Sequence, residues 1–232
     1  MRETRFPARS GGIVLTPLRR AAAIAFCAHL VAGLSMVLVL RRGLETNPDF
    51  QDRLAFLVNH RALWTLGWLA WTIAALAILY FYLVFAAAHQ RSSHFAVYLT
   101  VAALGPDLAA QAIEIGVLPN AGPEVFLTLH RLAVMLSGYV ANGLYSATAL
   151  MLVWGARHAY PAWVSIIGLA VGVFGIALSV AALLDWTAGM FWTNVFLVPS
   201  LLVWLAAIAI IPPAFKPRSG GRIFRRSAAE KE

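Results

Sequence analysis

A stretch of twenty predominantly apolar residues, 21–40, lies between two pairs of arginines, one at Arg19 and Arg20 and the other at Arg41 and Arg42. As an α-helix it would extend about 30 Å, the thickness of the hydrocarbon core of a bilayer. An arginine pair follows it in place of a small-residue cleavage site. We therefore interpret the stretch as a retained transmembrane helix rather than a secretory signal.

Five more apolar runs of similar length follow along the chain. The composition agrees with a membrane protein, because 61% of the residues are hydrophobic and 12% are charged, whereas a soluble domain has about 25% charged residues. The sequence predicts an all-α, polytopic membrane protein with one six-transmembrane-helix bundle covering residues 21–211. The predicted spans are residues 21–40, 62–88, 95–117, 132–154, 162–184 and 191–211.

The segments outside the spans predict how the bundle is oriented. Residues 1–20 and 212–232 are basic, and we expect them to be cytoplasmic tails, the second one disordered. The positive-inside rule then favours an N-in, C-in protein of a bacterial inner membrane. Between the first two spans, Asn47, Pro48 and Asp49 are typical of a helix start, with Asn47 as cap and Pro48 in the first turn. They predict a short outer helix over residues 48–59.

Three residues within the predicted spans carry acidic or imidazole side chains: His29, Asp107 and Glu114. An ionisable group inside a membrane is costly unless it is paired or hydrated, so such positions are functional candidates. Asp107, Gln111 and Glu114 are spaced i, i+4 and i+7 and therefore share one helical face. Pro106 precedes this face and predicts either a kinked helix or a helix broken near midspan, as in transporters.

Depth along the helices suggests partners for these residues on span four. Glu114 is level with Arg131 and His130, and we expect Glu114 and Arg131 to form an ion pair at the outer mouth of the bundle. His29 and Asn142 are expected to join Asp107 in an inner group.

Tyr145 lies close to the same stripe of span four as Arg131 and Asn142. For Asn142 and Tyr145, ordinary hydrogen bonding between helices is the alternative interpretation.

A tryptophan stripe on span two has two interpretations. Trp64, Trp68 and Trp71 are spaced i, i+4 and i+7, which favours packing against a neighbouring helix. The alternative is an aromatic pocket for an apolar or cationic ligand.

Several functional classes lack support in the sequence. The histidines have neither the spacing nor the partners of a metal or haem site, so no metal and no cofactor is predicted. The sequence lacks the G-x-S-x-G motif of α/β-hydrolases, the Walker loop of nucleotide-binding proteins and the H-E-x-x-H motif of zinc proteases. The basic residues flank apolar spans, which predicts the lipid bilayer as partner and no nucleic acid.

The remaining hypotheses differ in the role of the acidic face. The leading one is a protein that binds or transports a small solute, proton-coupled through Asp107. A membrane-embedded enzyme acting on a lipid or isoprenoid-like substrate is less favoured, because Asp107 and Glu114 lie about 10 Å apart along the helix axis and no nucleophile is evident. The third is a non-catalytic subunit, either a homo-oligomer or one that binds partner helices.

Overall fold

The computed structural model describes residues 11–89 and 94–214, and within them the chain is helical without a β-strand. Six helical segments are long and apolar enough to cross a membrane, which confirms the predicted six-helix bundle. The basic C-terminal tail from residue 215 onward lies outside the described residues. The six segments are Thr16–Leu38, Arg61–His89, His94–Asn120, Pro123–Ala156, Ala162–Leu183 and Thr187–Ile210.

Four of these segments belong to single α-helices: α1 (Gly11–Leu38), α3 (Arg61–His89), α7 (Ala162–Leu183) and α8 (Thr187–Ile210). The first helix thus begins ten residues ahead of the apolar run that predicts it.

The other two spans are composite and contain π-helical turns. Span three consists of α4 (His94–Ala112), the π-helical η2 (Ile113–Val117) and the short 3₁₀ helix η3 (Leu118–Asn120). Span four consists of α5 (Pro123–Val134), the π-helical η4 (Met135–Ala141) and α6 (Asn142–Ala156).

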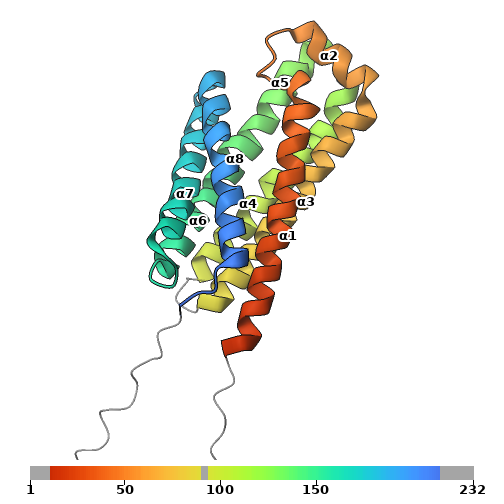
Figure 1. Ribbon diagram of the computed structural model, residues 1–232. Helices are drawn as coiled ribbons and strands as arrows, with labels where there is room; N and C mark the ends of the chain where they lie inside the picture. Colours follow the sequence, from red (N-terminus) through yellow and green to blue (C-terminus); the bar gives the residue numbers. More distant parts are fainter. Residues whose placement is uncertain (1–10, 90–93, 215–232) are drawn as a thin grey trace, which may run out of the picture.

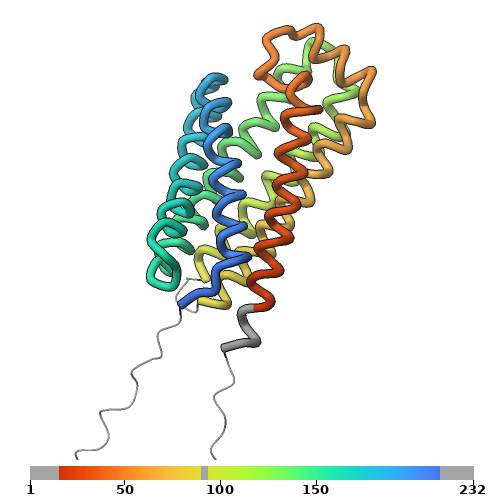
Figure 2. The backbone as a smooth tube through the Cα atoms, viewed as in Figure 1, coloured from red at the N-terminus to blue at the C-terminus, as the bar shows by residue number. Residues whose placement is uncertain are grey.

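The six spans form a ring in which each packs beside the next one in the sequence, and α8 returns to α1 (Figures 1 and 2). The start of α1 and the end of α8 lie at the same end of the bundle, which we call the terminal end. There the side chain of Arg19 donates to the carbonyl oxygens of Ala209 and Ile210, at 2.7 and 3.0 Å. The opposite, distal end carries the loops between α1 and α3.

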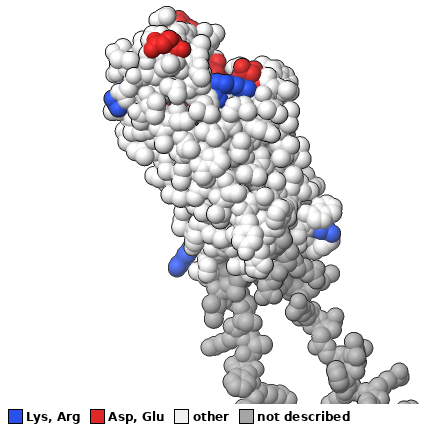
Figure 3. All heavy atoms as spheres, turned by 180° about the vertical axis from the view of Figure 1, so that it is seen from behind, with Lys and Arg blue, Asp and Glu red and all other residues white. Residues whose placement is uncertain are grey.

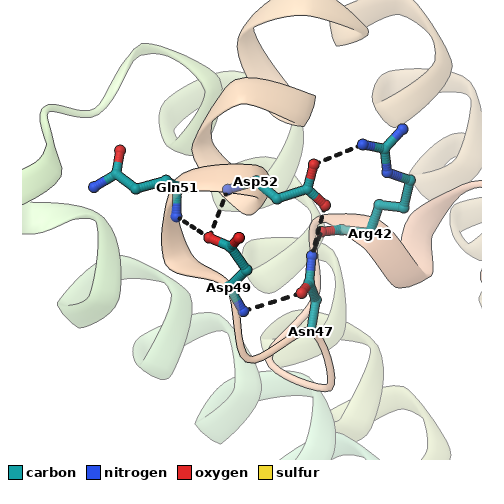
Figure 4. A network of polar contacts seen from close by, with 5 residues as sticks. All are labelled: Arg42, Asn47, Asp49, Gln51 and Asp52. Carbon is teal, nitrogen blue, oxygen red and sulfur yellow. Dashed lines mark hydrogen bonds and ion pairs between the residues drawn. The ribbon is translucent and has the colours of Figure 1, made fainter.

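The predicted outer helix is present at the distal end as α2 (Phe50–Asn59), but its cap differs from the expected one (Figure 4). Asp49 is the N-cap, and its Oδ1 accepts the backbone N–H groups of Gln51 and Asp52 at 2.9 and 3.1 Å. Asn47 instead accepts the N–H of Asp49 at 3.1 Å. The proline between them therefore precedes the helix, and the two side chains cap the turn in succession.

The apolar core has two parts. The larger one fills the bundle toward the terminal end around the fully buried rings of Phe81, Phe85 and Trp204. The smaller one lies under α2 around Trp64 and Phe126. On the outer surface, the face drawn in Figure 3 carries acidic side chains at the distal end and a wide uncharged band below them.

The helix is not broken at Pro106. α4 runs without interruption from His94 to Ala112, so the alternative of two half-helices meeting at midspan is wrong. The irregular turns of span three come later, in η2, where Glu114 lies.

Candidate functional site

Two groups of buried and partly buried polar side chains lie along the polar face predicted on span three. The distal polar cluster consists of Glu45, Arg53, Glu114 and His130, and the midspan polar cluster consists of Thr72, Asp107, Gln111, Ser137 and Tyr145. Each cluster includes one residue of a π-helical segment, namely Glu114 of η2 and Ser137 of η4. Such wide turns inside α-helices occur frequently at functional sites.

His130 is at the centre of the distal polar cluster. An Nη2 of Arg53 lies 2.9 Å from its Nδ1, and Oε2 of Glu45 lies 2.9 Å from its Nε2. A guanidinium can only donate, so Nδ1 must accept and the ring proton must be on Nε2, which donates to Glu45. The geometry therefore assigns the neutral Nε2–H tautomer to His130, and its contact with Glu45 is a hydrogen bond between a neutral donor and a carboxylate.

Arg53 supplies the positive charge of the cluster. Its side chain extends inward from α2, is 7% exposed, and also donates from Nε to the carbonyl oxygen of Gly43 at 3.3 Å. The guanidinium lies 5.4 Å from the centre of the Phe126 ring. Burial lowers the pKa of Arg53, while the negative charges of Glu45 and Glu114 act in the opposite direction. Arginine remains protonated under such conditions, so a full cation lies under α2.

Glu45 lies in the loop before α2, at the edge of the cluster. Burial raises the pKa of this carboxyl, but its interactions with His130, a backbone hydrogen bond and the charge of Arg53 together outweigh burial, and the pKa is below its ordinary value. Glu45 is thus held as a carboxylate and neutralises Arg53.

Glu114 is the second carboxyl of the cluster and has no cation of its own. Its side chain is 2% exposed, and Oε1 lies 4.0 Å from Nε2 of His130. Oε2 has no hydrogen-bond partner among the described residues. With one guanidinium and two carboxyls, the cluster carries an excess negative charge unless a proton is bound.

The backbone of Glu114 is fixed more firmly than its carboxyl. The indole Nε1 of Trp64 donates to the carbonyl oxygen of Glu114 at 2.7 Å. A π-helical turn disturbs the regular i to i−4 hydrogen bonds of the backbone, and this indole satisfies the carbonyl of Glu114 from a neighbouring helix.

Asp107 lies deeper in the bundle and is held by hydroxyl groups. Ser137 Oγ donates to Oδ1 at 2.9 Å and Tyr145 Oη to Oδ2 at 3.3 Å. The Asp107 side chain is 8% exposed, and no described lysine, arginine or histidine forms an ion pair with it. One turn later, Gln111 Oε1 accepts the hydroxyl of Thr72 at 2.5 Å, which links α4 to α3.

The hydroxyl partners of Asp107 on span four are less buried than Asp107 itself. Ser137 and Tyr145 are both only partly buried, whereas Asp107 behind them is buried. A small polar ligand that reached η4 would thus meet two hydroxyls and a carboxyl at one depth. This arrangement provides hydrogen-bond acceptors and donors, but no nucleophile poised beside a base.

The expected ion pair between Glu114 and Arg131 is wrong. Arg131 instead forms an ion pair with Asp185 at 2.8 Å and donates to the carbonyl oxygens of Ala182 and Leu183 at 2.8 and 3.1 Å. It therefore caps the C-terminal end of α7, where free carbonyls and the helix dipole favour a cation.

The chain turns sharply at that helix end. Asp185 has a φ of 55°, and the N–H groups of Asp185 and Trp186 bond back to the carbonyls of Ala182 and Ala181. This left-handed C-terminal motif presents the last carbonyls of α7 to Arg131.

The expected inner group of His29, Asp107 and Asn142 does not form. Nδ1 of His29 bonds to the carbonyl oxygen of Ala25 in its own helix at 2.9 Å, and the ring packs edge-on against Trp71. Within the described chain, no hydrogen bond links the side chain of His29 or Asn142 to Asp107. Tyr145 does contact Asp107, as a bond between helices.

The tryptophan stripe of α3 is packed in the core. Trp64 is fully buried, and Trp68 packs edge-on against it with ring centres 5.8 Å apart. Both belong to the smaller core cluster. The interpretation as helix packing therefore fits the structure, and Trp64 additionally serves as the hydrogen-bond donor to Glu114.

Four members of the clusters, Arg53, Glu45, Ser137 and Thr72, are absent from the predicted set because they lie outside the predicted spans or are not ionisable. Arg53 and Glu45 lie in the connection between the first two spans, and Ser137 is a hydroxyl among small residues. For Arg53 a signal exists: it lies three and four positions before Phe56 and Leu57, which are buried, so it shares the inward face of α2.

Among the described residues, no three histidine, cysteine, aspartate or glutamate side chains are placed to hold a metal ion. Comparison of the chain with models of known protein families, with curated proteins and with solved structures found no significant match. The function is therefore argued from the two clusters alone.

Proposed function

We propose that this protein binds and transports a small solute across a membrane, and that protonation of buried carboxyls on span three accompanies transport. One observation carries the proposal: Asp107 and Glu114 share a face of span three, and neither has a cation of its own among the described residues. A bundle of this kind packs without buried carboxyls, whose desolvation is expensive. Their presence is best explained by a proton or a solute that they bind.

Asp107 is proposed as the solute or proton site because of its partners. Two hydroxyl groups can stabilise its anion, and the same hydroxyls can turn to accept when the carboxyl is protonated. The site thus accommodates both charge states without moving a helix. Glu114 is a second buried carboxyl that can bind a proton, nearer the distal end and 4.0 Å from His130.

The geometry favours transport over acid–base catalysis. Asp107 and Glu114 contact different partners, on η4 and α6 in the first case and around His130 in the second. They do not converge on a common point where a substrate bond would lie, as a general acid and base must.

The test is transport by the full chain in proteoliposomes. Currents on a solid-supported membrane are recorded for a panel of amino acids, carboxylates, sugars and organic cations under an imposed pH gradient. We expect Asp107→Asn to abolish the pH-dependent current while Ser179→Ala, which removes a hydroxyl bonded within its own helix, leaves it intact. A solute current that Asp107→Asn leaves unchanged would contradict the role of Asp107.

We also propose that both chain ends face the cytoplasm of a bacterial cell. Of the 18 lysines and arginines of the sequence, 13 lie in the two tails and in the two connections on the same side, whereas five, Arg41, Arg42, Arg53, Arg61 and Arg131, lie toward the distal end. This asymmetry agrees with the positive-inside rule. Fusions of alkaline phosphatase and of a fluorescent protein to the C-terminus test it, and we expect only the fluorescent fusion to be active.

A further inference from the structure

A cavity outside both clusters lies at the distal end, between the end of α1 and the start of α8. It measures about 690 Å³, within the range of small-molecule sites. The polar part of its lining comes from the loop after α1 and the apolar part from α8. Its lining residues are Arg41, Arg42, Thr46, Asn47, Pro48, Thr187, Ala188, Phe191 and Trp192.

The cavity lies where α1 and α8 diverge. The two helices are in contact at midspan, where a Cβ on Gly33 would lie 3.2 Å from Val198 Cγ1. Toward the terminal end they are joined by Arg19. Figures 1 and 2 show them side by side in that half and separated at the distal end. The cavity therefore lies beyond the contact of the two helices, and we call it the distal groove.

The charge of the cavity is positive, and one of its arginines is not neutralised. Arg42 forms an ion pair with Asp52 at 2.6 Å, as Figure 4 shows, and its guanidinium lies over the ring of Phe56. Arg41 is exposed and forms no ion pair with any described acidic residue. The lining contains no acidic residue. A group that bears negative charge is thus the complement of the distal groove.

The wall of the groove is apolar and aromatic. Phe191 and Trp192 pack edge-on with ring centres 5.2 Å apart, and Trp192 is 58% exposed. Val195, which is also exposed, follows one turn further along α8. A ligand with an apolar chain could lie along it, with its polar end at Arg41.

We propose that this cavity binds the phosphate headgroup of an anionic phospholipid, with one acyl chain in the groove between α1 and α8. The phosphate contacts the guanidinium of Arg41, with the hydroxyls of Thr46 and Thr187 within the same groove. The acyl chain packs against Phe191 and Trp192. An exposed tryptophan near the end of a span is also a typical contact of the lipid headgroup region.

The test is lipid binding by the purified full-length protein, measured by native mass spectrometry. Dioleoylphosphatidylglycerol is compared with dioleoylphosphatidylcholine, whose headgroup has no net charge, and with glycerol 3-phosphate, which lacks acyl chains. We expect phosphatidylglycerol to bind most tightly. Equal binding of phosphatidylcholine would show that the arginine does not select for charge. Equal binding of glycerol 3-phosphate would show that the groove takes a free phosphate compound. Either result overturns the proposal.

Variants locate the bound lipid. Arg41→Gln should weaken phosphatidylglycerol binding about tenfold, the loss of one hydrogen bond to a charged group. Trp192→Ala should weaken it as well, without affecting glycerol 3-phosphate. Arg20→Gln makes the same change of charge at an exposed position of the terminal end and is the matched control. Binding that Arg41→Gln and Arg20→Gln reduce equally would overturn the site, and circular dichroism confirms that each variant is folded.

Discussion

Arg53 and His130, which are 77 positions apart in the sequence, are joined by a buried hydrogen bond of 2.9 Å between Nη2 and Nδ1. The bond connects the outer helix α2 to span four, and it determines which ring nitrogen of His130 carries the proton. Through that proton it also orients Glu45. A single guanidinium thus organises the distal end of the bundle.

Replacing Arg53 should destabilise the protein strongly. Arg53→Met leaves two carboxyls and an imidazole nitrogen under α2 without their cation, and removing one partner of a buried charge pair costs about 3 kcal/mol or more. The measurement is unfolding of the purified protein in detergent. The control is Arg61→Met, because Arg61 donates to Asn120 at the surface, where a polar contact contributes less than about 1 kcal/mol. Equal losses in the two variants would contradict a structural role for the buried cation.

The stability of the distal end should depend on pH through Glu45. Its pKa is lowered on folding, so its contribution is complete above the ordinary value of 4.5 and is lost as the pH falls through the lowered value. We expect Glu45→Gln to be less stable than the parent at pH 7, and the difference to shrink on acidification below pH 4.5. Thermal unfolding of both proteins between pH 7 and pH 3 measures it.

Salt separates this effect from that of an exposed carboxylate. The pKa of Asp52 is also lowered, by its hydrogen bond from Arg42, but this pair is exposed. The effect of Asp52→Asn should therefore vanish in 1 M salt, at which charges are screened within about 3 Å, while that of Glu45→Gln persists. If salt abolished both effects, the burial of His130 would not shield the interaction of Glu45 from salt.

Arg131 is expected to stabilise the end of α7. Arg131→Gln removes a cation from two carbonyls and from Asp185, which should cost about 1 to 2 kcal/mol of unfolding free energy. Arg131→Lys keeps the charge but cannot donate from two guanidinium nitrogens to two carbonyl oxygens at once. Its loss of unfolding free energy should therefore be intermediate. Hydrogen exchange followed by mass spectrometry should show faster exchange around residues 181–186 in the glutamine variant. Unchanged exchange there would contradict the capping role.

Ser137 and Asp107 should be energetically coupled. In a double-mutant cycle of Ser137→Ala and Asp107→Asn, the interaction energy should be about 1 to 3 kcal/mol, because the bond is to a buried carboxyl. Ser179→Ala combined with Asp107→Asn provides the additive reference, since Ser179 bonds to Gly175 in its own helix. A coupling no larger than this reference would show that the bond contributes little.

The fold and the buried carboxyls follow from the sequence, because both rest on hydropathy. Apolar runs of the right length predict the spans, and an acidic residue inside one must be buried in the bundle. The positions of Asp107 and Gln111 on one face also follow, since the regular α-helix extends through Ala112, whereas Glu114 lies in η2 beyond it.

The partners on span four could not be predicted by the same arithmetic. The predicted stripe of Arg131, Asn142 and Tyr145 assumes a regular helix, but η4 lies between Arg131 and Asn142. Its wider turns rotate the second half of the span relative to the first. Arg131 consequently faces α7, whereas Tyr145 faces α4. A π-helical segment leaves no clear mark in the sequence, so a stripe drawn across it is wrong.

In the ring of six spans, α1 and α8 are the one neighbouring pair that is not consecutive in the chain. The other neighbouring spans are consecutive in the chain and can associate as soon as both have been inserted. The contact between α1 and α8 can form only after the final span has been inserted. Assembly therefore ends when these two helices meet. A molecule bound to both Arg41 and Trp192 would add a contact across this boundary at the distal end, where the two helices diverge.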